Sequence, residues 1–209
     1  MKKFQTIFLT LEGIEGSGKS TNAKVVYEIL EKNSINYIAT REPGGSQIGP
    51  ELRKLLLKKN EEISSEVELL LMLADRKDHV EKLILPKLND GNWIVSDRFM
   101  DSTIAYQGGG RGLDIKKIEL ISNLLKFPEP NCTILFDLPV EEGLKRVSER
   151  GDLDRFEKES IDFHKRVRKA YLNLAKINPQ RIKVIDSSAS KKTVEKEVCI
   201  IINELINGY

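Results

Sequence analysis

The sequence predicts an α/β fold: a doubly wound, parallel five-stranded sheet flanked by helices. Apolar runs rich in β-branched residues recur along the 209 residues, and segments with helical periodicity separate them. Glycine-rich or charged residues follow these runs, where strands of a parallel sheet would end. The predicted strands are residues 6–11, 36–40, 93–97, 132–137 and 182–186. Ligands of such sheets bind beyond the carboxyl ends of the strands, so we expect the functional residues there.

The first predicted strand leads directly into Gly-Ile-Glu-Gly-Ser-Gly-Lys-Ser at residues 13–20. The pattern G-x-x-x-x-G-K-S between a strand and a helix is typical of a loop whose backbone N–H groups surround the phosphates of a nucleoside triphosphate. We expect Lys19 to reach the β- and γ-phosphates and Ser20 to offer its hydroxyl to Mg²⁺. A plain glycine-rich turn is the alternative, which the strand and helix context disfavours. The predicted nucleotide-binding residues are Gly13, Ile14, Glu15, Gly16, Ser17, Gly18, Lys19, Ser20 and Thr21.

Charged residues follow the second and third strands. Asp97 ends an apolar strand, the position from which a carboxylate reaches the Mg²⁺ of a phosphate-loop protein, and Arg98 follows it. Arg41, Arg53 and Arg76 are candidates for holding a second phosphate, because the guanidinium fork matches phosphate oxygens. Taken singly, each of these arginines is better interpreted as a solvated surface charge.

Two helical segments have contrasting patterns. Residues 66–76 are apolar on nearly every side, which predicts a helix through the interior, and Arg76 at its polar turn then needs an anion. That anion is either a nearby carboxylate or a ligand phosphate. Residues 191–206 carry apolar residues at helical spacing and predict a helix that only packs against the sheet.

Three glycine-containing stretches predict mobile loops over a site, at residues 42–45, 107–112 and 150–155. The last contains Arg150 and Arg155 and predicts a short lid over approximately residues 149–157. A lid of this kind brings positive charge to a transferred phosphoryl group and excludes water.

The composition narrows the class of protein. With 40% hydrophobic residues, the chain suffices for a single domain over residues 1–209. Its 34 basic and 32 acidic side chains give a net charge of +2, so we expect no nucleic acid partner. No apolar stretch approaches the roughly twenty residues of a membrane span, and no signal region precedes the first strand, so we expect a soluble cytoplasmic protein. Cys132 and Cys199 predict buried, reduced thiols.

Several segments together resemble the thymidylate kinase family in its bacterial form, and the similarity covers nearly the whole chain. The phosphate loop carries no arginine here, so the chain resembles those members that have the catalytic arginine in the lid. The matching segments are residues 11–21, 40–45, 51–53, 74–76, 97–108 and 143–155.

This resemblance implies a phosphate-loop nucleoside-monophosphate kinase fold with a short lid. It implies transfer of the γ-phosphoryl group of ATP, with Mg²⁺, to dTMP, giving dTDP and ADP, and it suggests a homodimer with a contact around residues 66–88. The alternative enzyme is a kinase of another pyrimidine nucleotide, such as dUMP, UMP or CMP. A GTP-dependent switch is disfavoured, because no N-K-x-D guanine-reading motif occurs.

The resemblance also implies roles for individual residues. Glu15 would accept a hydrogen bond from the 3′-hydroxyl of the deoxyribose, and Tyr106 would lie where a ribose 2′-hydroxyl would be. Met72 stands where many relatives have a phenylalanine that stacks on thymine, so base affinity is expected to differ here. The implied catalytic residues are Lys19, Asp97, Arg98 and a lid arginine, with Arg155 preferred to Arg150. The implied acceptor-phosphate residues are Arg53, Arg76 and Arg98. The remaining substrate residues implied are Arg41, Pro43, Ser102, Thr103 and Gln107, the last two for the thymine edge, and Tyr171 near the sugar.

Overall fold

The computed structural model describes residues 5–59, 62–149, 151 and 153–208. Its centre is a five-stranded sheet with the order β2-β3-β1-β4-β5, and every neighbouring pair of strands is parallel. The predicted α/β fold is confirmed, and each strand lies within two residues of its predicted bounds. The strands are β1 (Phe8–Glu12), β2 (Tyr37–Arg41), β3 (Trp93–Asp97), β4 (Cys132–Asp137) and β5 (Ile182–Asp186).

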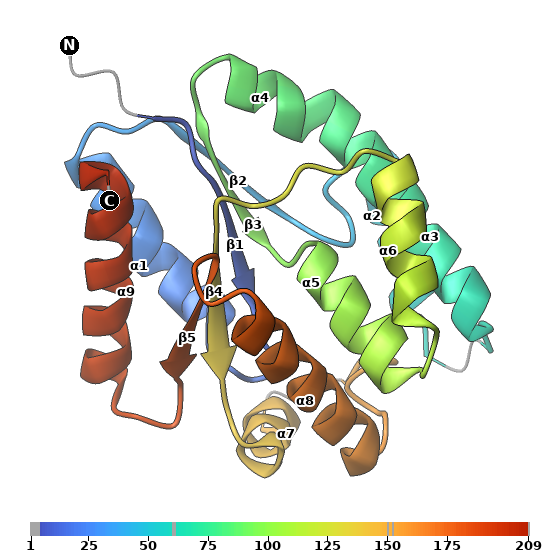
Figure 1. The fold of residues 1–209 in the computed structure, drawn as a ribbon. Coiled ribbons are helices and arrows are strands. Elements are labelled where there is room, and N and C mark those ends of the chain that lie inside the picture. The colour runs from blue at the N-terminus through green and yellow to red at the C-terminus, as the bar shows by residue number, and fades with distance from the viewer. Residues whose placement is uncertain (1–4, 60–61, 150, 152, 209) are drawn as a thin grey trace.

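Helices cover both faces of the sheet (Figure 1). On one face, α1 and α9 pack against the sheet through a core that includes Leu11, Val26, Phe136 and Val198. The remaining helices lie on the other face and around the carboxyl edge of the sheet. The helices are α1 (Lys19–Lys32), α2 (Gly49–Leu57), α3 (Ser65–His79), α4 (Leu85–Asn89), α5 (Met100–Thr103), α6 (Ile115–Leu124), α7 (Val140–Ser148), α8 (Ile161–Ile177) and α9 (Lys191–Asn207).

Two stretches of wider, π-helical turns join some of these helices. Val80–Ile84 connects α3 to α4, and Ile104–Gly110, called η2, continues α5. The chain is therefore continuously helical over residues 66–88.

The register of the strands brings the predicted functional residues to one edge. Leu11 pairs with Asp97, and Asp97 pairs in turn with Arg41 on the other side of β3. The glycine-rich loop follows Glu12 at the end of β1. The carboxyl edge of the sheet therefore carries that loop, an acid and an arginine side by side.

The structure corrects the prediction that the helix over residues 66–76 runs through the interior. Val67 and Leu70 of α3 are 47% and 59% exposed, whereas Glu68, Asp75 and Arg76 are buried. Polar residues are buried here because they bind one another and neighbouring loops; Asp75, for example, accepts hydrogen bonds from the Gly44 backbone N–H and the Ser46 hydroxyl. Among the apolar residues of α3, Leu69 and Leu73 pack in a hydrophobic core cluster, whereas Val67 and Leu70 face outward.

The structure also corrects the predicted mobile loop at residues 107–112. Gln107 to Gly110 belong to η2, and the glycines there are close-packing positions. A Cβ atom on Gly109 would lie 2.6 Å from the Ala170 Cβ of α8, and one on Gly110 would lie 2.5 Å from the Phe163 ring. Glycine is required at these positions by close contact with α8, not by flexibility.

The cysteines are both free thiols, as predicted: Cys132 is buried in β4 and Cys199 is half-buried on α9. Within the described part of the chain, no helix is both long enough and apolar enough to cross a membrane. The helix predicted over residues 191–206 is confirmed as α9, which buries Val194, Val198, Ile202 and Leu205.

Candidate active site

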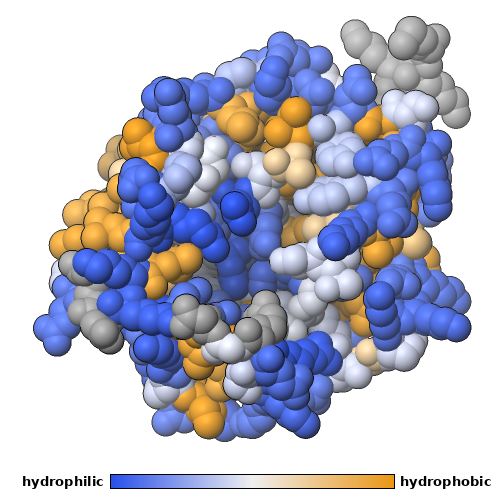
Figure 2. All heavy atoms as spheres, turned by 180° about the vertical axis from the view of Figure 1, so that it is seen from behind, coloured by the Kyte–Doolittle hydropathy of each residue, from blue (hydrophilic) through white to orange (hydrophobic). Residues whose placement is uncertain are grey.

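A cavity of about 510 Å³ opens at the carboxyl edge of the sheet. The glycine-rich loop forms one wall, β2 and α2 contribute another, and residues of the predicted lid border the rim. Seen from behind, the molecule has a hollow near its centre that is bordered mainly by hydrophilic residues (Figure 2). Of the predicted nucleotide-binding residues, Gly13 and Ile14 do not line the cavity, while those lining it are Glu15, Gly16, Ser17, Gly18, Lys19, Ser20 and Thr21.

The glycine-rich loop has the backbone that phosphate binding requires. Gly16 and Gly18 have positive φ angles of 72° and 90°, which a residue with a side chain rarely adopts. A Cβ atom on Gly16 would also lie 2.4 Å from the carbonyl oxygen of Gly143 at α7. The loop is therefore seated against α7 and leads into the N-terminus of α1, where a helix dipole favours anions.

Lys19 is curled into this loop. Its Nζ donates hydrogen bonds to the carbonyl oxygens of Gly13 and Ile14, at 3.0 and 2.9 Å. Burial and the charge of Arg98 lower the pKa of Lys19 to about 8, although Asp97 and Glu15 oppose this shift. The ammonium group of Lys19 is therefore buried beside a second cation, and the negative charge of a bound triphosphate would stabilise its charged form.

Asp97 and Ser20 line the same cavity and fit the implied Mg²⁺. The Asp97 Oδ1 atom is buried and has no hydrogen-bond partner, which leaves a carboxylate oxygen ready for a cation. Across the described residues there is no group of three or more His, Cys, Asp or Glu side chains that would hold a metal unaided. This agrees with Mg²⁺, which binds through one or two protein oxygens together with substrate phosphates and water.

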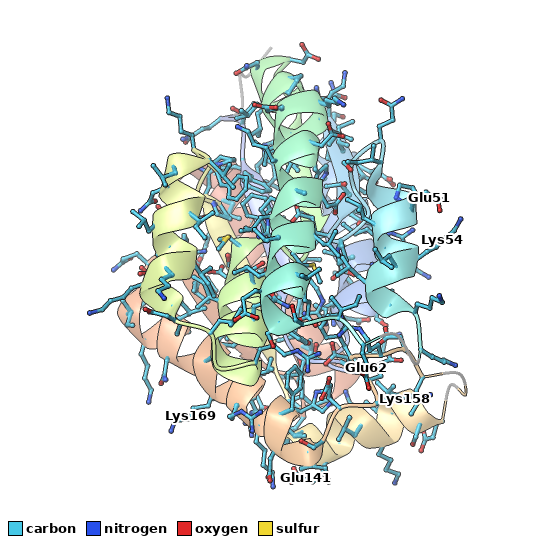
Figure 3. All side chains as sticks on the ribbon, turned by 90° about the vertical axis from the view of Figure 1, so that its right-hand side faces the viewer. Glu51, Lys54, Glu62, Glu141, Lys158 and Lys169 are labelled. Carbon is cyan, nitrogen blue, oxygen red and sulfur yellow. The ribbon has the colours of Figure 1, made fainter. Side chains whose placement is uncertain are left out.

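Three arginines converge on the cavity between the glycine-rich loop and α2. They are Arg41 from β2, Arg53 from α2 and Arg98 after β3. Burial and the nearby charge of Arg41 lower the pKa of Arg53, as expected for like charges held close together. Glu51 and Lys54 of the same helix point outward instead (Figure 3). Such a cluster binds an anion of a second ligand favourably.

A second, smaller cavity of about 30 Å³ adjoins the first. Pro43, Met72, Arg98 and Tyr106 line both cavities, so the two form one continuous site. The smaller cavity is also lined by Arg76, Ser102, Thr103 and Gln107. Tyr171 lies beneath it, with its hydroxyl 2.7 Å from the Ser102 hydroxyl and 3.1 Å from Arg98. All of the predicted substrate-binding residues therefore lie at one joined site.

Arg76 lies apart from Arg41 and Arg53. It lines only the smaller cavity, beside Thr103 and Gln107, rather than the larger one that Arg41 and Arg53 line. Its anion is the buried Glu42 carboxylate, with a distance of 2.7 Å between Nε and Oε2. The carboxylate alternative considered for this arginine is thus the observed one, which leaves Arg76 at the end of the site away from the glycine-rich loop.

Glu15 stands where the two cavities meet. Its Oε1 atom accepts hydrogen bonds from the Tyr106 hydroxyl and from Arg98. Its Oε2 atom is buried without a hydrogen-bond partner, 3.5 Å from Nδ1 of the buried His164. Burial raises the pKa of Glu15, but the His164 ring and the charge of Arg98 outweigh this and lower it to about 2. The group is a carboxylate that can accept a hydrogen bond from a hydroxyl group.

Arg155 is folded away from the larger cavity. Its Nε atom donates to the Leu56 carbonyl oxygen at 2.8 Å, and a terminal nitrogen lies 2.8 Å from Glu68 Oε2. Its lid neighbours Asp154 and Phe156 do line that cavity. Arg150, the other predicted lid arginine, lies outside the described residues.

The structure adds two residues that the sequence analysis did not single out. Arg146 of α7 lines the larger cavity and donates to the carbonyl oxygens of Gly16 and Ser187, and His164 faces Glu15. Both lie within helices rather than at strand ends, so a search at strand ends does not find them.

Together, the fold and the paired cavities define a phosphate-loop nucleoside-monophosphate kinase fold. A family model described as "Thymidylate kinase" matches residues 11–198. The chain is 44% identical over 192 residues to the thymidylate kinase of Carboxydothermus hydrogenoformans, covering 91% of this chain and 94% of that protein. It is 42% identical over 200 residues to that of Vesicomyosocius okutanii, covering 95% and 98%. The chain belongs to the thymidylate kinase family.

A solved structure gives the same result. The crystal structure of thymidylate kinase from Ehrlichia chaffeensis is similar to this structure with a TM-score of 0.77 and 34% sequence identity, covering 95% of this chain and 98% of that one. The likeness therefore extends over the sheet, its helices and the site at the carboxyl edge.

Proposed function

We propose that this protein transfers the γ-phosphoryl group of ATP to dTMP, giving dTDP and ADP. The observation that carries the proposal is the joined site, in which three arginines separate a phosphate loop from a smaller cavity with hydrogen-bonding side chains. A phosphate oxygen of dTMP attacks the γ-phosphorus, and the bond from that phosphorus to the bridging oxygen breaks as ADP leaves. The acceptor phosphate is already anionic at neutral pH, so no general base is required.

The residues of the larger cavity would position the two phosphates and neutralise the charge between them. Lys19 and the N-terminus of α1 bind the triphosphate, and Arg41, Arg53 and Arg98 bind the phosphate of dTMP. Asp97 and Ser20 would hold Mg²⁺, which, when bound, supplies neutralisation of phosphate charge.

The thymidine part of the acceptor would lie where the smaller cavity opens into the larger one. Thr103 and Gln107 offer hydrogen bonds to the edge of the base, and Met72 offers an apolar contact to its face. Glu15 would accept a hydrogen bond from the 3′-hydroxyl, and the ring of Tyr106, whose hydroxyl donates to Glu15, would occupy the place of a ribose 2′-hydroxyl. A base with a different pattern of donors and acceptors would leave the buried polar groups of Thr103 and Gln107 without hydrogen-bond partners.

A panel of acceptors tests the proposal. We expect the highest kcat/KM with dTMP in the presence of ATP and Mg²⁺, and much lower values with dUMP, UMP and CMP. If UMP and dTMP gave comparable values, the protein would be a kinase of another pyrimidine nucleotide. GTP retained without phosphorylation of any acceptor would indicate a nucleotide switch instead.

We further propose that a lid arginine acts on the transferred phosphoryl group, and that Arg155 leaves Glu68 to do so when both nucleotides are bound. Arg155→Ala should then lower kcat by a factor of about 10³ or more while changing the Kd of ATP little. Lys145→Ala, exposed on α7, is the control and should leave both unchanged. If kcat were unaltered in Arg155→Ala, the proposal for Arg155 would fail and Arg150 would be the candidate instead.

A homodimer is also part of the proposal. Val67 and Leu70 of α3, and Leu120 and Leu124 of α6, are between 47% and 72% exposed. These two helices lie side by side on one face (Figure 3). Light scattering should give a dimer for the native chain and a monomer for Leu70→Glu. Ile177→Glu, at an exposed position of α8, should remain dimeric; a native monomer would contradict the proposal.

We expect the protein to act in the cytoplasm. The support is chemical: its two cysteines are free, as thiols are in a reducing compartment, and its proposed substrates are ATP and a nucleotide. Activity recovered only in a membrane or exported fraction of the cells would contradict this expectation.

A further inference from the structure

Glu68 of α3 lies behind the smaller cavity and lines neither part of the site. Its side chain is 0% exposed, yet it carries an ionisable carboxylate. Three side chains surround it. Gln107 donates from Nε2 to Glu68 Oε1 at 2.8 Å, Arg111 donates from Nε to both carboxylate oxygens at 3.2 Å, and Arg155 lies 2.8 Å from Oε2.

The charges of this cluster balance when Glu68 is a carboxylate. A buried carboxylate is costly unless cations and hydrogen bonds compensate it. Arg111 and Arg155 supply two positive charges, and Glu159, which pairs with Arg111 at the rim, supplies the second negative charge. If Arg155 moves into the larger cavity, Glu68 still keeps Arg111 and Gln107.

An ionised carboxylate dictates how the Gln107 amide is oriented. A carboxylate only accepts hydrogen bonds, so the NH₂ group of Gln107 must face Glu68 and the amide oxygen must face elsewhere. Gln107 belongs to η2, which continues α5 between α3 and α8 (Figure 1), and its side chain lines the smaller cavity. With its NH₂ group turned toward Glu68, Gln107 has its amide oxygen available as an acceptor for a base.

This orientation selects among bases. Thymine has a donor at N3, which an amide oxygen accepts, whereas cytosine has an acceptor at N3, which the same oxygen repels. We propose that Glu68 is a positioning residue that fixes the Gln107 amide and thereby sets the preference of the site for thymine over cytosine. The inference rests on the proposed function of the same site.

The substitution Glu68→Gln tests this with little change of shape. The two arginines require an oxygen from residue 68, so the new amide turns its NH₂ group toward Gln107. Gln107 must then present its oxygen to residue 68 and its NH₂ group to the base. The kcat/KM ratio of dTMP to dCMP should fall about tenfold or more, because the hydrogen bond to thymine N3 is lost and one to cytosine N3 becomes possible.

Two further variants complete the experiment. Glu159→Gln removes the carboxylate that pairs with Arg111 at the rim of the same cluster, and it should leave the ratio within about twofold. The exchanged pair Glu68→Gln with Gln107→Glu keeps one buried carboxylate and again offers an acceptor oxygen to the base. It should restore most of the native ratio.

The outcomes separate this inference from the proposed function. If the native enzyme does not phosphorylate dTMP, the proposed function fails whatever the variants do. If it does, and Glu68→Gln folds with an unchanged ratio of dTMP to dCMP, the positioning role is overturned. If Glu68→Gln does not fold, the exchanged pair decides: a native-like ratio supports the role, and a ratio about tenfold lower or worse overturns it.

Discussion

Arg98 combines an unusual backbone with a central position. Its φ angle is 74°, in the left-handed region that costs a residue with a side chain roughly 1–2 kcal/mol. Its guanidinium group donates to the Gly13 carbonyl oxygen, pairs with Glu15 and lies 4.9 Å from the centre of the Tyr106 ring. Backbone strain of this kind persists where the surroundings fix the side chain. Here the fixed side chain is that of Arg98, which lines both cavities.

Lys19 is the residue whose charge should respond most directly to ligands. Its pKa of about 8 is low because the side chain is buried beside Arg98. A bound triphosphate stabilises the ammonium form and therefore raises this pKa. The contribution of this contact to the affinity for ATP is then fully present below the pKa that Lys19 has in the free protein. It is lost as the pH rises toward the pKa that Lys19 has in the complex.

We therefore expect the Kd of ATP with Mg²⁺ to be nearly constant below about pH 8 and to rise by up to about tenfold per pH unit above it. Calorimetric titration of the native protein across this range measures the effect. Lys19→Arg provides the control, because arginine stays charged, so its weaker binding should not change with pH. A native Kd that is flat up to about pH 9.5 would show that Lys19 does not titrate in this way.

At the scale of elements, η2 and α8 form the contact that places two residues of the cavity wall. Gly109 packs on Ala170 of α8, and Gly110 packs on Phe163. The close approach carries Tyr106 and Gln107 into the wall of the site. The glycines are therefore part of how the element is positioned, although they touch no ligand.

Gly109→Ala should destabilise the protein by about 1–3 kcal/mol, because the new Cβ atom would lie 2.6 Å from the Ala170 Cβ. Ala170→Gly alone should cost about 1 kcal/mol as a glycine within a helix. The double variant should lose at least about 1 kcal/mol less than the sum, since the clash is removed. Urea unfolding of the three variants measures this, and strictly additive losses would contradict the packing explanation.

The same element shows where the sequence stops being informative. A run of glycines in a sequence predicts a flexible loop. Here the glycines are instead required by close packing against α8, about sixty residues later, and the local sequence does not reveal such a distant contact. The glycine-rich loop and the strand ends could be predicted, since their spacing reflects local backbone requirements and the rule for parallel sheets. Glu68, Arg146 and His164 could not, because each acts from within a helix on a distant residue.

At the scale of the whole molecule, the parallel sheet creates the site. Its register sets Arg41, Asp97 and the glycine-rich loop side by side, and α2 and α3 close the other side. Ligands that bind across these elements stabilise the folded chain, because the unfolded chain has no such site.

We expect dTMP at about one hundred times its Kd to stabilise the protein by about 2.7 kcal/mol, which raises the Tm of a chain of this size by about 5–10 °C. Thymidine at the same concentration lacks the phosphate that Arg41, Arg53 and Arg98 would bind, so its effect should be much smaller. Differential scanning calorimetry compares the two. Equal shifts from thymidine and dTMP would mean that the arginine cluster does not bind the acceptor phosphate, and the assignment of the larger cavity would fail with it.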